Sequence, residues 1–381
     1  MAKIVTEATT LERVAVIKDK KYGKRSFIRG DEAQKRIPRL QTGIFALTYA
    51  TGNGYPFWRM TRIKGPEHGG KSTTAITAMK MCSMTCWKCL KIKEFCVCPE
   101  GPTSMKSVYL DSEGTLDPEW VKAIGVPADE YYMPTAPDGG AYLDLADASL
   151  MADDCGLVII DSVASLLPPM ETDRAIGDRQ VGSLPKLLTD GAAKLTNRLI
   201  EERRRGHRCF IIAINQIRKE MGVGLYQNPE TEAGGHAFRH WSALGIRISK
   251  LSTKDEKHHG SDDNFAVVQK HGFKIDKDKV WTITKDGDFL RARGDIISES
   301  GEVTYRKGDT VEEHVIYEYG AKHNIIEDLG TSKHIIKGLM PKGLNKTDLI
   351  QLLRTNQPLR YQVHKDITNA AWQEYEDRCV R

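Results

Sequence analysis

The chain of 381 residues is long enough for one large hydrophobic core and a smaller satellite domain. Hydrophobic residues make up 40% of the chain and charged residues 28%, which excludes the disordered and fibrous classes of protein, and a net charge of +5 permits a nucleic-acid partner without requiring one. No apolar run approaches the roughly 20 residues of a membrane-spanning helix, and the amino-terminal stretch has no apolar signal region. We therefore expect a cytoplasmic protein with no membrane partner.

The first predicted part is an amino-terminal segment, residues 1–50, which is too small to hold a core of its own. Residues 11–21 are expected to form a short helix, and residues 26–28 are expected to be extended. Such a segment must therefore pack on something else.

The second predicted part, residues 51–300, alternates short apolar strands with helical stretches. Helices are expected after Lys71, Pro118, Ala141 and Leu184. The expected strands are residues 60–64, 108–111, 157–161, 210–215, 244–249, 265–269 and 280–284. This alternation predicts an α/β core with a mainly parallel, twisted sheet and helices on both faces. The last strands follow one another closely, so we expect them to extend one edge of the sheet in antiparallel fashion.

The third predicted part, residues 301–381, is a small α-rich domain. Its expected helices cover residues 311–323, 348–355 and 361–378, with Asn345 as a start signal and Pro358 as a stop signal. Four lysines in this part form either a face that captures duplex DNA or a solvated basic surface; they are Lys333, Lys337, Lys342 and Lys346.

A phosphate-binding loop lies between a predicted strand and a predicted helix. It matches the pattern G-x-x-x-x-G-K-[ST] and consists of Gly65, Pro66, Glu67, His68, Gly69, Gly70, Lys71, Ser72 and Thr73. Glycines let backbone N–H groups close around phosphate oxygens, and the start of the helix adds partial positive charge. We expect Lys71 to reach the β- and γ-phosphates, Ser72 to ligate Mg²⁺, and Thr73 to donate to a phosphate oxygen.

Two carboxylates follow neighbouring predicted strands. Asp161 ends the apolar run 157–161, and this position suits a residue that holds Mg²⁺, through water. Glu113 follows the strand 108–111, whose carboxyl end faces the ligand crevice of an open α/β sheet. Glu113 either orients the attacking water or is a solvated acid in a loop.

Read together, several segments resemble the RecA family of recombinases, in a single order over residues 12–285. They are YGKRSFIR (22–29), LQTG (40–43), TGNGYP (51–56), DSEGTLDP (111–118), IDSVASL (160–166), residues 171–178, INQIR (214–218), and the stretch from NPET to GG (228–235). The resemblance implies a RecA-type P-loop NTPase core, preceded by an oligomerisation segment at residues 1–50. It also implies an ATP-dependent recombinase that forms helical filaments on single-stranded DNA, pairs it with homologous double-stranded DNA and exchanges strands.

The resemblance assigns roles around the nucleotide. It makes Glu113 the general base and Gln216 the sensor of the γ-phosphate, beside the catalytic Lys71. Asp117 and Trp120 fall where the family contacts adenine, although plain helix packing also explains Trp120.

The family places ATP between adjacent protomers of the filament, and the neighbour supplies cations. Lys270 and Arg239 match such positions. Gly272 stands where the family often has a second lysine, and Lys274 is a candidate substitute.

The resemblance also implies two DNA-binding loops, residues 168–182 and 218–235. Their candidate contacts are the basic residues Arg174, Arg179, Arg218 and Lys219, the backbone of Gly222, Gly234 and Gly235, and the base wedges Val181 and Met221. Phosphate contacts give affinity without sequence preference, which suits a recombinase. Ordinary loop packing is the alternative for Val181 and Met221.

Cysteines cluster in an insert at about residues 82–100 that typical RecA proteins lack. Cys86, Cys89, Cys96 and Cys98 can surround one tetrahedral Zn²⁺, with Cys82 as a spare ligand. A redox switch and unliganded thiols are the alternatives. The insert is either a staple that holds itself together or, through Lys88, Lys91 and Lys93, a surface for DNA or a partner.

Two other functions compete with a recombinase. One is a RecA-fold DNA motor or helicase, against which the order of Glu113, Gln216 and the stretch 228–231 argues. The other is a zinc-stapled, non-catalytic DNA-binding accessory protein, against which the intact set of Lys71, Glu113 and Asp161 argues.

Overall fold

The computed structural model describes residues 36–168, 182–219, 230–232, 237–251, 268–297, 303–330 and 332–379, together with Leu11 and Lys20. Most of the predicted amino-terminal helix and the extended residues 26–28 lie outside this part. Among the described residues, none of the helices has both the length and the apolar character that crossing a bilayer requires.

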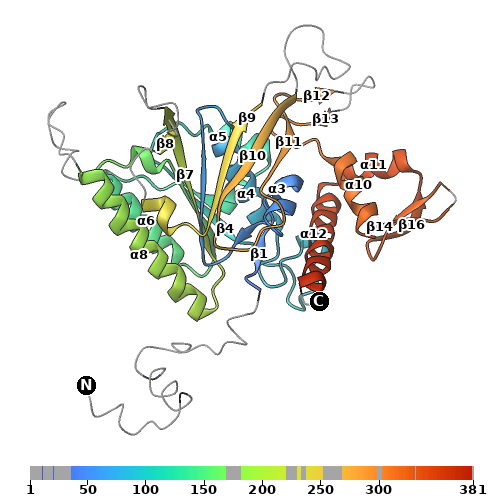
Figure 1. Ribbon diagram of the computed structural model, residues 1–381, viewed down its shortest axis with the longest axis horizontal. Coiled ribbons are helices and arrows are strands. Elements are labelled where there is room, and N and C mark those ends of the chain that lie inside the picture. The colour runs from blue at the N-terminus through green and yellow to red at the C-terminus, as the bar shows by residue number, and fades with distance from the viewer. Residues whose placement is uncertain are drawn as a thin grey trace.

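A nine-stranded sheet forms the centre of the molecule (Figure 1). Its strands are β3 (Met60–Gly65), β4 (Lys106–Asp111), β5 (Tyr131–Tyr132), β6 (Cys155–Asp161), β7 (Phe210–Lys219), β8 (Glu230–Glu232), β9 (Leu244–Lys250), β10 (Val268–Asp278) and β11 (Asp286–Ala292). The order across the sheet is β11-β10-β9-β3-β7-β6-β4-β5, and β8 pairs with β7. The pairs from β9 to β5 are parallel, whereas β10 and β11 are antiparallel. The predicted parallel sheet with an antiparallel edge is thus confirmed.

One predicted strand, residues 280–284, is wrong. These residues form the loop between β10 and β11, and the chain re-enters the sheet only at Asp286. The apolar character of the segment reflects packing instead. Val280 is buried, and the Trp281 and Trp372 rings pack edge to face with their centres 4.0 Å apart. The neighbouring strand, predicted at 265–269, is described from Val268 and continues to Asp278.

Helices cover both faces of the sheet because its central strands are apolar on both sides. Ile159 packs with α4 (Lys71–Met84) and α5 (Pro118–Ile124), while its neighbour Ile160 packs with α6 (Gly139–Leu150) and α8 (Ser183–Arg205). Successive side chains of a strand point to opposite faces, so a buried parallel strand is apolar throughout. Replacing either isoleucine by alanine would cost roughly 2–5 kcal/mol of stability.

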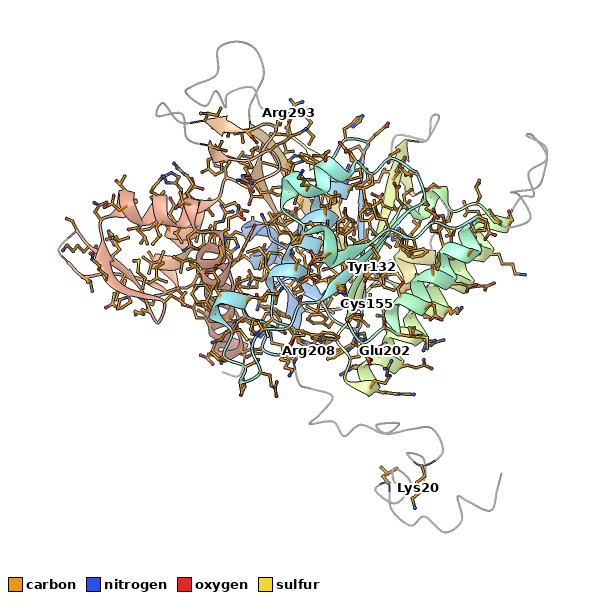
Figure 2. All side chains as sticks on the ribbon, turned by 180° about the vertical axis from the view of Figure 1, so that it is seen from behind. Lys20, Tyr132, Cys155, Glu202, Arg208 and Arg293 are labelled. Atoms are coloured by element: carbon orange, nitrogen blue, oxygen red, sulfur yellow. The ribbon has the colours of Figure 1, made fainter. Side chains whose placement is uncertain are left out.

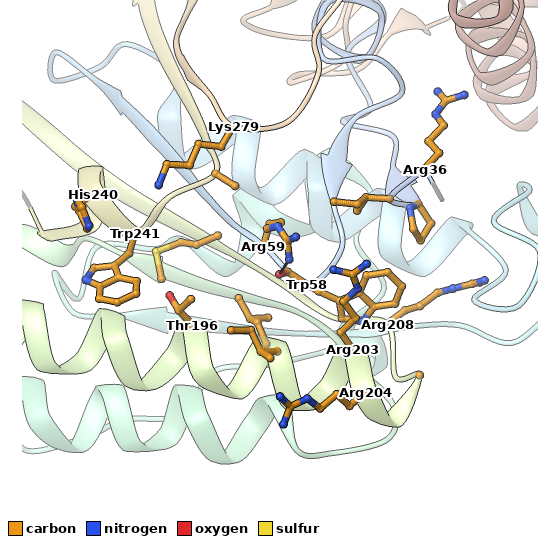
Figure 3. A pocket seen from close by; sticks show the side chains of 17 residues that line it. Arg36, Trp58, Arg59, Thr196, Arg203, Arg204, Arg208, His240, Trp241 and Lys279 are labelled. Carbon is orange, nitrogen blue, oxygen red and sulfur yellow. Dashed lines mark hydrogen bonds between the residues drawn. The ribbon is translucent and has the colours of Figure 1, made fainter. Parts of the chain in front are cut away.

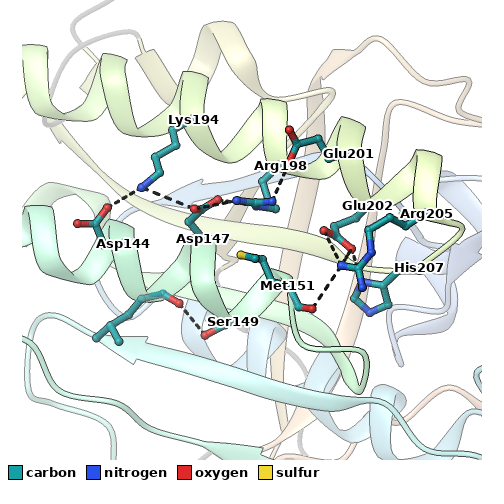
Figure 4. Close-up of polar contacts among 11 residues, drawn as sticks. Asp144, Asp147, Ser149, Met151, Lys194, Arg198, Glu201, Glu202, Arg205 and His207 are labelled. Carbon is teal, nitrogen blue, oxygen red and sulfur yellow. Dashed lines mark hydrogen bonds and ion pairs between the residues drawn. The ribbon is translucent and has the colours of Figure 1, made fainter. Parts of the chain in front are cut away.

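Ion pairs join α6 and α8 on the outside of the sheet (Figure 4). Arg198 donates to Asp147 at 2.8 Å, and Lys194 donates to Asp144 at 2.7 Å. At the end of α8, Arg205 reaches Glu202, whose carboxylate also lies 3.0 Å from His207. These contacts fix the direction of α8 relative to the sheet.

Short elements precede the sheet and extend it. They are β1 (Arg39–Leu40), α3 (Phe45–Ala50), β2 (Tyr55–Pro56), α9 (Ala237–Trp241), β12 (Ile296–Ile297), β13 (Val303–Tyr305) and the single helical turns Lys93–Phe95, Ala128–Glu130 and Val163–Ser165. β1 pairs with β2, and β12 pairs with β13.

The carboxyl-terminal unit contains the expected helices and a small sheet that the sequence did not predict. The helices are α10 (Glu313–Lys322), α11 (Lys346–Thr355) and α12 (Gln357–Cys379), and the sheet consists of β14 (Ile326–Asp328), β15 (His334–Ile336) and β16 (Met340–Leu344). Strands of three to five residues are too short to show a clear alternation in sequence.

Helix α3 connects the two ends of the chain. Phe45 joins the apolar cluster of the carboxyl-terminal unit, which includes Ile316 and Val363. The Glu312 carboxylate accepts a hydrogen bond from the Phe45 N–H at 2.7 Å, so it satisfies a free donor at the start of α3. The division of the chain at residues 50 and 300 stays a prediction, and this contact crosses both of its limits.

A candidate nucleotide site and a candidate metal centre

Most of the predicted nucleotide residues meet in one cavity of about 950 Å³ at the carboxyl ends of β3, β4, β6 and β7. Of the predicted set, its lining contains Glu67, His68, Gly69, Gly70, Lys71, Ser72, Thr73, Glu113, Trp120, Asp161 and Gln216. Asp117 lines an adjoining cavity of about 210 Å³ together with Trp120. The strand ends of a parallel sheet therefore gather residues that are up to about 150 positions apart in the chain.

The phosphate loop is shaped by glycines with little space around them. A Cβ at Gly65 would lie 2.0 Å from the Ile248 carbonyl oxygen. Gly70 has a φ of +94°, a conformation that side chains other than glycine rarely adopt, and it precedes the first residue of α4. The loop thus turns sharply into the helix and leaves the N–H groups at the start of α4 free for an anion.

The Lys71 side chain contacts the backbone of the phosphate loop. Its Nζ donates to the Pro66 carbonyl at 2.8 Å. Burial lowers the pKa of Lys71, while the nearby charges of Asp161 and Glu113 oppose that change. The ammonium group therefore lies between the loop backbone and two carboxylates, where the β- and γ-phosphates are expected.

Asp161 ends β6 in a buried position beside the loop. Tyr109 donates its hydroxyl hydrogen to the Asp161 carboxylate. Burial raises the pKa of Asp161, and hydrogen bonds from Tyr109 and Ser72 counteract this rise. A buried carboxylate next to a serine hydroxyl is a donor set that suits Mg²⁺, so the predicted ligands Ser72 and Asp161 fit this ion.

Glu113 and Gln216 are in direct contact. Glu113 Oε1 accepts hydrogen bonds from Gln216 Nε2 at 2.9 Å and from the Ser162 hydroxyl at 2.5 Å. The turn that carries Glu113 is held by Asp111, whose carboxylate accepts from the N–H of Gly114 at 2.9 Å and of Leu116 at 2.8 Å. The expected base and the expected sensor therefore form one unit, and Ser162 is a member that the sequence did not reveal.

His271 is a second residue that the sequence analysis missed. Its Nδ1 lies 3.0 Å from the Gly69 carbonyl oxygen, and its ring stacks on Phe289 at 5.3 Å. Burial, and then the charge of Arg291, lower the pKa of His271 to about 4. The ring is therefore neutral near pH 7 and must carry its proton on Nδ1, because a carbonyl only accepts. His271 lies on β10, and no local pattern links it to the loop.

Trp120 is placed where either of its predicted roles is possible, and its contact with adenine stays a prediction. It lines the nucleotide cavity and also packs, half-buried, beside the core. Lys307 was not predicted, and its Nζ lies 4.9 Å from the centre of the Trp120 ring. The side chain of Asp117 caps α5 by accepting from the Glu119 N–H at 2.9 Å.

The residues predicted to act on a neighbour's nucleotide do not line the chain's own cavity. Lys270 lies on β10 and its Nζ is 3.5 Å from Asp288, and Arg239 is exposed on α9. Their predicted role stays a prediction.

The DNA-loop predictions fall largely outside the described residues. This holds for Arg174, Arg179, Val181, Met221, Gly222, Gly234 and Gly235. Arg218 and Lys219 lie at the end of β7, where only their backbone is described.

The four predicted zinc ligands come together. One sulfur atom from each of Cys86, Cys89, Cys96 and Cys98 lies within 4.8 Å of the others. The Cys86–Cys98 and Cys89–Cys96 sulfur pairs are 3.8 and 3.7 Å apart. A tetrahedron with Zn–S bonds of about 2.3 Å has an edge of ~3.8 Å, so the cluster has the size of a zinc site. Cys82 is buried in the core and is not part of the cluster.

The cysteine insert is held between the start of β7 and α12. Arg208 donates to the carbonyls of Trp87 and Lys88, and Lys365 on α12 donates to that of Leu90. Lys88 pairs with Glu100, and Lys93 lies 3.4 Å from Glu130. Two of the three lysines that suggested a DNA surface thus have acidic partners, which favours the staple.

Comparison with known proteins agrees with this geometry. The family model of the RecA N-terminal domain matches residues 9–290. The chain is 30% identical over 362 residues to Protein RecA of Nitratidesulfovibrio vulgaris, with 94% of this chain and 87% of that protein covered. It is 31% identical to Protein RecA of Saccharopolyspora erythraea, with 89% and 90% covered, and 32% identical to that of Limosilactobacillus reuteri, with 75% and 71% covered.

Proposed function

Because the chain belongs to the RecA family, we propose that it forms helical filaments on single-stranded DNA and hydrolyses ATP in response to that DNA. The family membership makes it an ATP-dependent recombinase of DNA recombination and repair. The finer proposal is homologous pairing with double-stranded DNA and strand exchange, in the cytoplasm, with ATP at the protomer interface.

The contact between Glu113 and Gln216 carries the proposal. Gln216 lies on β7, and β7 runs on to Lys219, into the predicted second DNA loop that begins at Arg218. In the described state the Glu113 carboxylate is occupied by Gln216 and Ser162. DNA bound at this predicted loop would move the end of β7, so Gln216 would turn to the γ-phosphate and free Glu113 to accept a proton from water.

The remaining residues hold the nucleotide in place. The backbone of residues 65–73 surrounds the phosphates, Lys71 neutralises charge on the β- and γ-phosphates, and Trp120 offers a ring face to adenine. Mg²⁺, when bound by Ser72 and Asp161, would neutralise charge that develops on the phosphates. Lys270 and Arg239, which do not line their own cavity, would serve the neighbouring protomer.

The four cysteines would hold Zn²⁺ as a structural ion. The first support is the set of four cysteine sulfur atoms with the spacing of a tetrahedron. The second is that Arg208 and Lys365 donate hydrogen bonds to backbone carbonyls of the insert. Duplex capture by Lys333, Lys337, Lys342 and Lys346 stays a prediction, and Lys337 already lies 3.4 Å from Glu327.

ATP hydrolysis with and without single-stranded DNA tests the proposal, with Glu113→Gln as the control for contaminating activity. We expect strong stimulation by DNA that the control lacks, together with helical filaments in electron micrographs. A rate that ignores DNA would contradict the proposal. Rings in place of filaments would favour a DNA motor, and no hydrolysis at all would favour a DNA-binding accessory protein.

A further inference from the structure

A second cavity, which we call the basic pocket, opens at the other end of the sheet. Its volume is about 960 Å³. It lies between the starts of β3 and β7, the last turns of α8, and α9. Figure 2 shows Arg208 of this pocket and Arg293 of the nucleotide cavity at opposite ends of the molecule. Apart from Arg208, which also donates to carbonyls of the cysteine insert, no residue of the basic pocket has a role assigned above.

The lining of the basic pocket is strongly cationic. It contains Arg36, Arg59, Arg203, Arg204, Arg208 and Lys279, and no acidic residue among the described ones. Within the described part of the chain, none of these six side chains forms an ion pair with a carboxylate, although Glu376 lies close enough to Arg36 to raise its pKa against the effect of burial. Burial, and then the charge of Arg203, lower the pKa of Arg59. Positive charges that repel one another in a concave surface are typical of a site for a polyanion.

The helix dipole of α8 does not explain this concentration. Basic residues at a helix carboxyl end do offset its partial negative charge, and α8 ends with three arginines. However, Arg205 pairs with Glu202 and Asp153 outside the pocket, as Figure 4 shows for Glu202, whereas Arg203 and Arg204 line it. The other cations come from four further segments of the chain, where no dipole of α8 would select them.

Two indole rings indicate what kind of polyanion fits. Figure 3 shows Trp241 at one end of the pocket and Trp58 with Arg203 and Arg208 toward the other. The Trp58 ring is held by its Nε1, which donates to the His207 carbonyl at 2.5 Å, and the Arg203 guanidinium lies 5.7 Å from its centre. Fixed aromatic faces among arginines bind nucleobases together with phosphates, whereas an acidic peptide offers no flat ring for them.

The chain's own amino-terminal segment is a poor occupant. Residues 1–35 carry nine basic and five acidic side chains, so their charge has the same sign as the pocket. We propose that the basic pocket binds a segment of single-stranded nucleic acid, with phosphates on the arginines and bases against Trp58 and Trp241. Thr196 and Arg203 line it two turns apart on α8, so it is about 10 Å long and accommodates roughly two nucleotides.

This site is separate from the predicted DNA loops. The first loop ends where α8 begins at Ser183, and the pocket lies near the other end, at Arg203. A helix of 23 residues is about 34 Å long. The proposal therefore goes beyond the proposed function and adds a second place for a strand.

Photo-cross-linking locates the strand without any variant. Full-length protein is irradiated with an oligothymidylate in which 5-iododeoxyuridine replaces thymidine, and tryptic peptides are identified by mass spectrometry. We expect adducts on the peptides 40–59 and 240–247, which contain Trp58 and Trp241 and which trypsin separates from both predicted loops. Adducts confined to residues 169–181 and 220–236 would overturn the proposal.

Charge reversal measures the contribution of the pocket. For Arg203→Glu with Arg204→Glu, we expect at least a ten-fold loss of these cross-links. The slope of log affinity against log salt concentration should also become shallower by ~1.4, because two phosphate contacts are lost. The matched control is Lys122→Glu with Lys322→Glu, which alters net charge equally on two exposed helix positions and should change neither. Arg203→Lys with Arg204→Lys, which keeps both charges, guards against misfolding and should retain most of the salt slope.

Two further probes separate the alternatives. An abasic oligodeoxyribose phosphate of equal length should bind about five-fold or more weakly, since it has no bases to stack. If it bound equally well, or if a glutamate decapeptide competed as efficiently as the oligonucleotide, the pocket would be a general anion or acidic-peptide site and the proposal would be wrong. DNA-stimulated ATP hydrolysis is measured on the same samples, so a failure of the proposed function is seen independently of the cross-links.

Discussion

The nucleotide cavity and the basic pocket have nearly the same volume, about 950 and 960 Å³, and lie at opposite ends of the same strands, yet they treat charge differently. In the nucleotide cavity Lys71 is near both Asp161 and Glu113, and each of these three side chains has a hydrogen-bond partner. In the basic pocket no acidic residue stands among the described lining residues, and Arg203 lies close enough to Arg59 to lower its pKa. Binding in the first cavity should thus depend on geometry, and binding in the second on ionic strength.

The difference also concerns what each cavity can do. The nucleotide cavity is lined by both carboxylates and cations, so the proposed function can assign it an anion, a metal ion and the movement of a proton. The basic pocket has no carboxylate among its described lining residues that could act as a base. It can hold and orient a strand, and its occupancy should leave the chemistry of ATP unchanged unless the whole sheet shifts.

The largest expected effect lies in the nucleotide cavity. Glu113→Gln keeps the shape of the side chain and removes the proton acceptor, so kcat for ATP should fall by about 10²–10⁴-fold while ATP still binds. Ser162→Ala is the matched variant, because it removes one donor from Glu113 and should change kcat by less than ten-fold. The measurement is steady-state hydrolysis with saturating DNA. Cross-linking in the basic pocket should be unaltered in both variants, and a parallel loss there would mean that the two cavities are not independent.

Removal of zinc should affect the basic pocket more than the nucleotide cavity. Arg208 lines the pocket and donates to two carbonyls of the cysteine insert, so loss of the ion should release Arg208. Structural zinc sites contribute several kcal/mol or more to folding. We expect Cys89→Ser with Cys96→Ser to lose one zinc per chain, to unfold at a clearly lower temperature, and to bind the oligonucleotide with a shallower salt dependence.

The control for the zinc prediction is the buried Cys155→Ser, which lies outside the cluster and should keep the metal. Metal content by mass spectrometry and thermal unfolding are the measurements. A double-serine variant that keeps one zinc per chain and its full stability would show that the ligand set is wrong.

His271 gives a smaller effect that is confined to the nucleotide cavity. His271→Ala removes the donor to the Gly69 carbonyl, and we expect the KM for ATP to rise about ten-fold with kcat less affected. His271→Asn keeps a donor at a similar distance and should restore most of the affinity. Equal KM values for all three proteins would show that this hydrogen bond does not shape the loop.

The pH dependence of stability provides a second test of His271. Its pKa in the folded protein, about 4, lies below its ordinary value, so the unfolded chain binds the proton more tightly. The stability that the neutral His271 ring contributes to the folded protein is fully present above about pH 6.5 and is lost as the pH falls toward 4. His271→Asn should flatten the unfolding free energy over this interval, and an unchanged slope would contradict the assignment of a buried neutral ring.

The sequence revealed the nucleotide cavity because its main parts are contiguous. The phosphate loop is one run of nine residues, and Glu113 and Asp161 directly follow apolar strands. His271 and Ser162 were missed because their roles depend on the register of β10 and on a side chain that meets Glu113 only after folding. The prediction of a strand at 280–284 was wrong because a loop that packs on the core can have the same apolar sequence pattern as a strand.

The basic pocket could not have been predicted in the same way. Its cations come from the chain before β1, from the starts of β3 and β7, from α8 and from the loop after β10, and none of these segments matches a motif. The triplet of arginines at the end of α8 is the one local signal, and it is equally typical of an ordinary helix end. The carboxyl-terminal sheet was missed because its strands are very short.

The smallest expected effect distinguishes the staple from a DNA surface on the cysteine insert. Lys88 is exposed and pairs with Glu100, and exposed ion pairs contribute little to stability. If the insert only braces the fold, Lys88→Ala should leave the unfolding temperature, the zinc content and the salt dependence of oligonucleotide binding unchanged. A weaker salt dependence in Lys88→Ala, with normal zinc, would instead extend the nucleic-acid surface from the basic pocket across Arg208 onto the insert, because Arg208 contacts the Lys88 carbonyl at 2.8 Å.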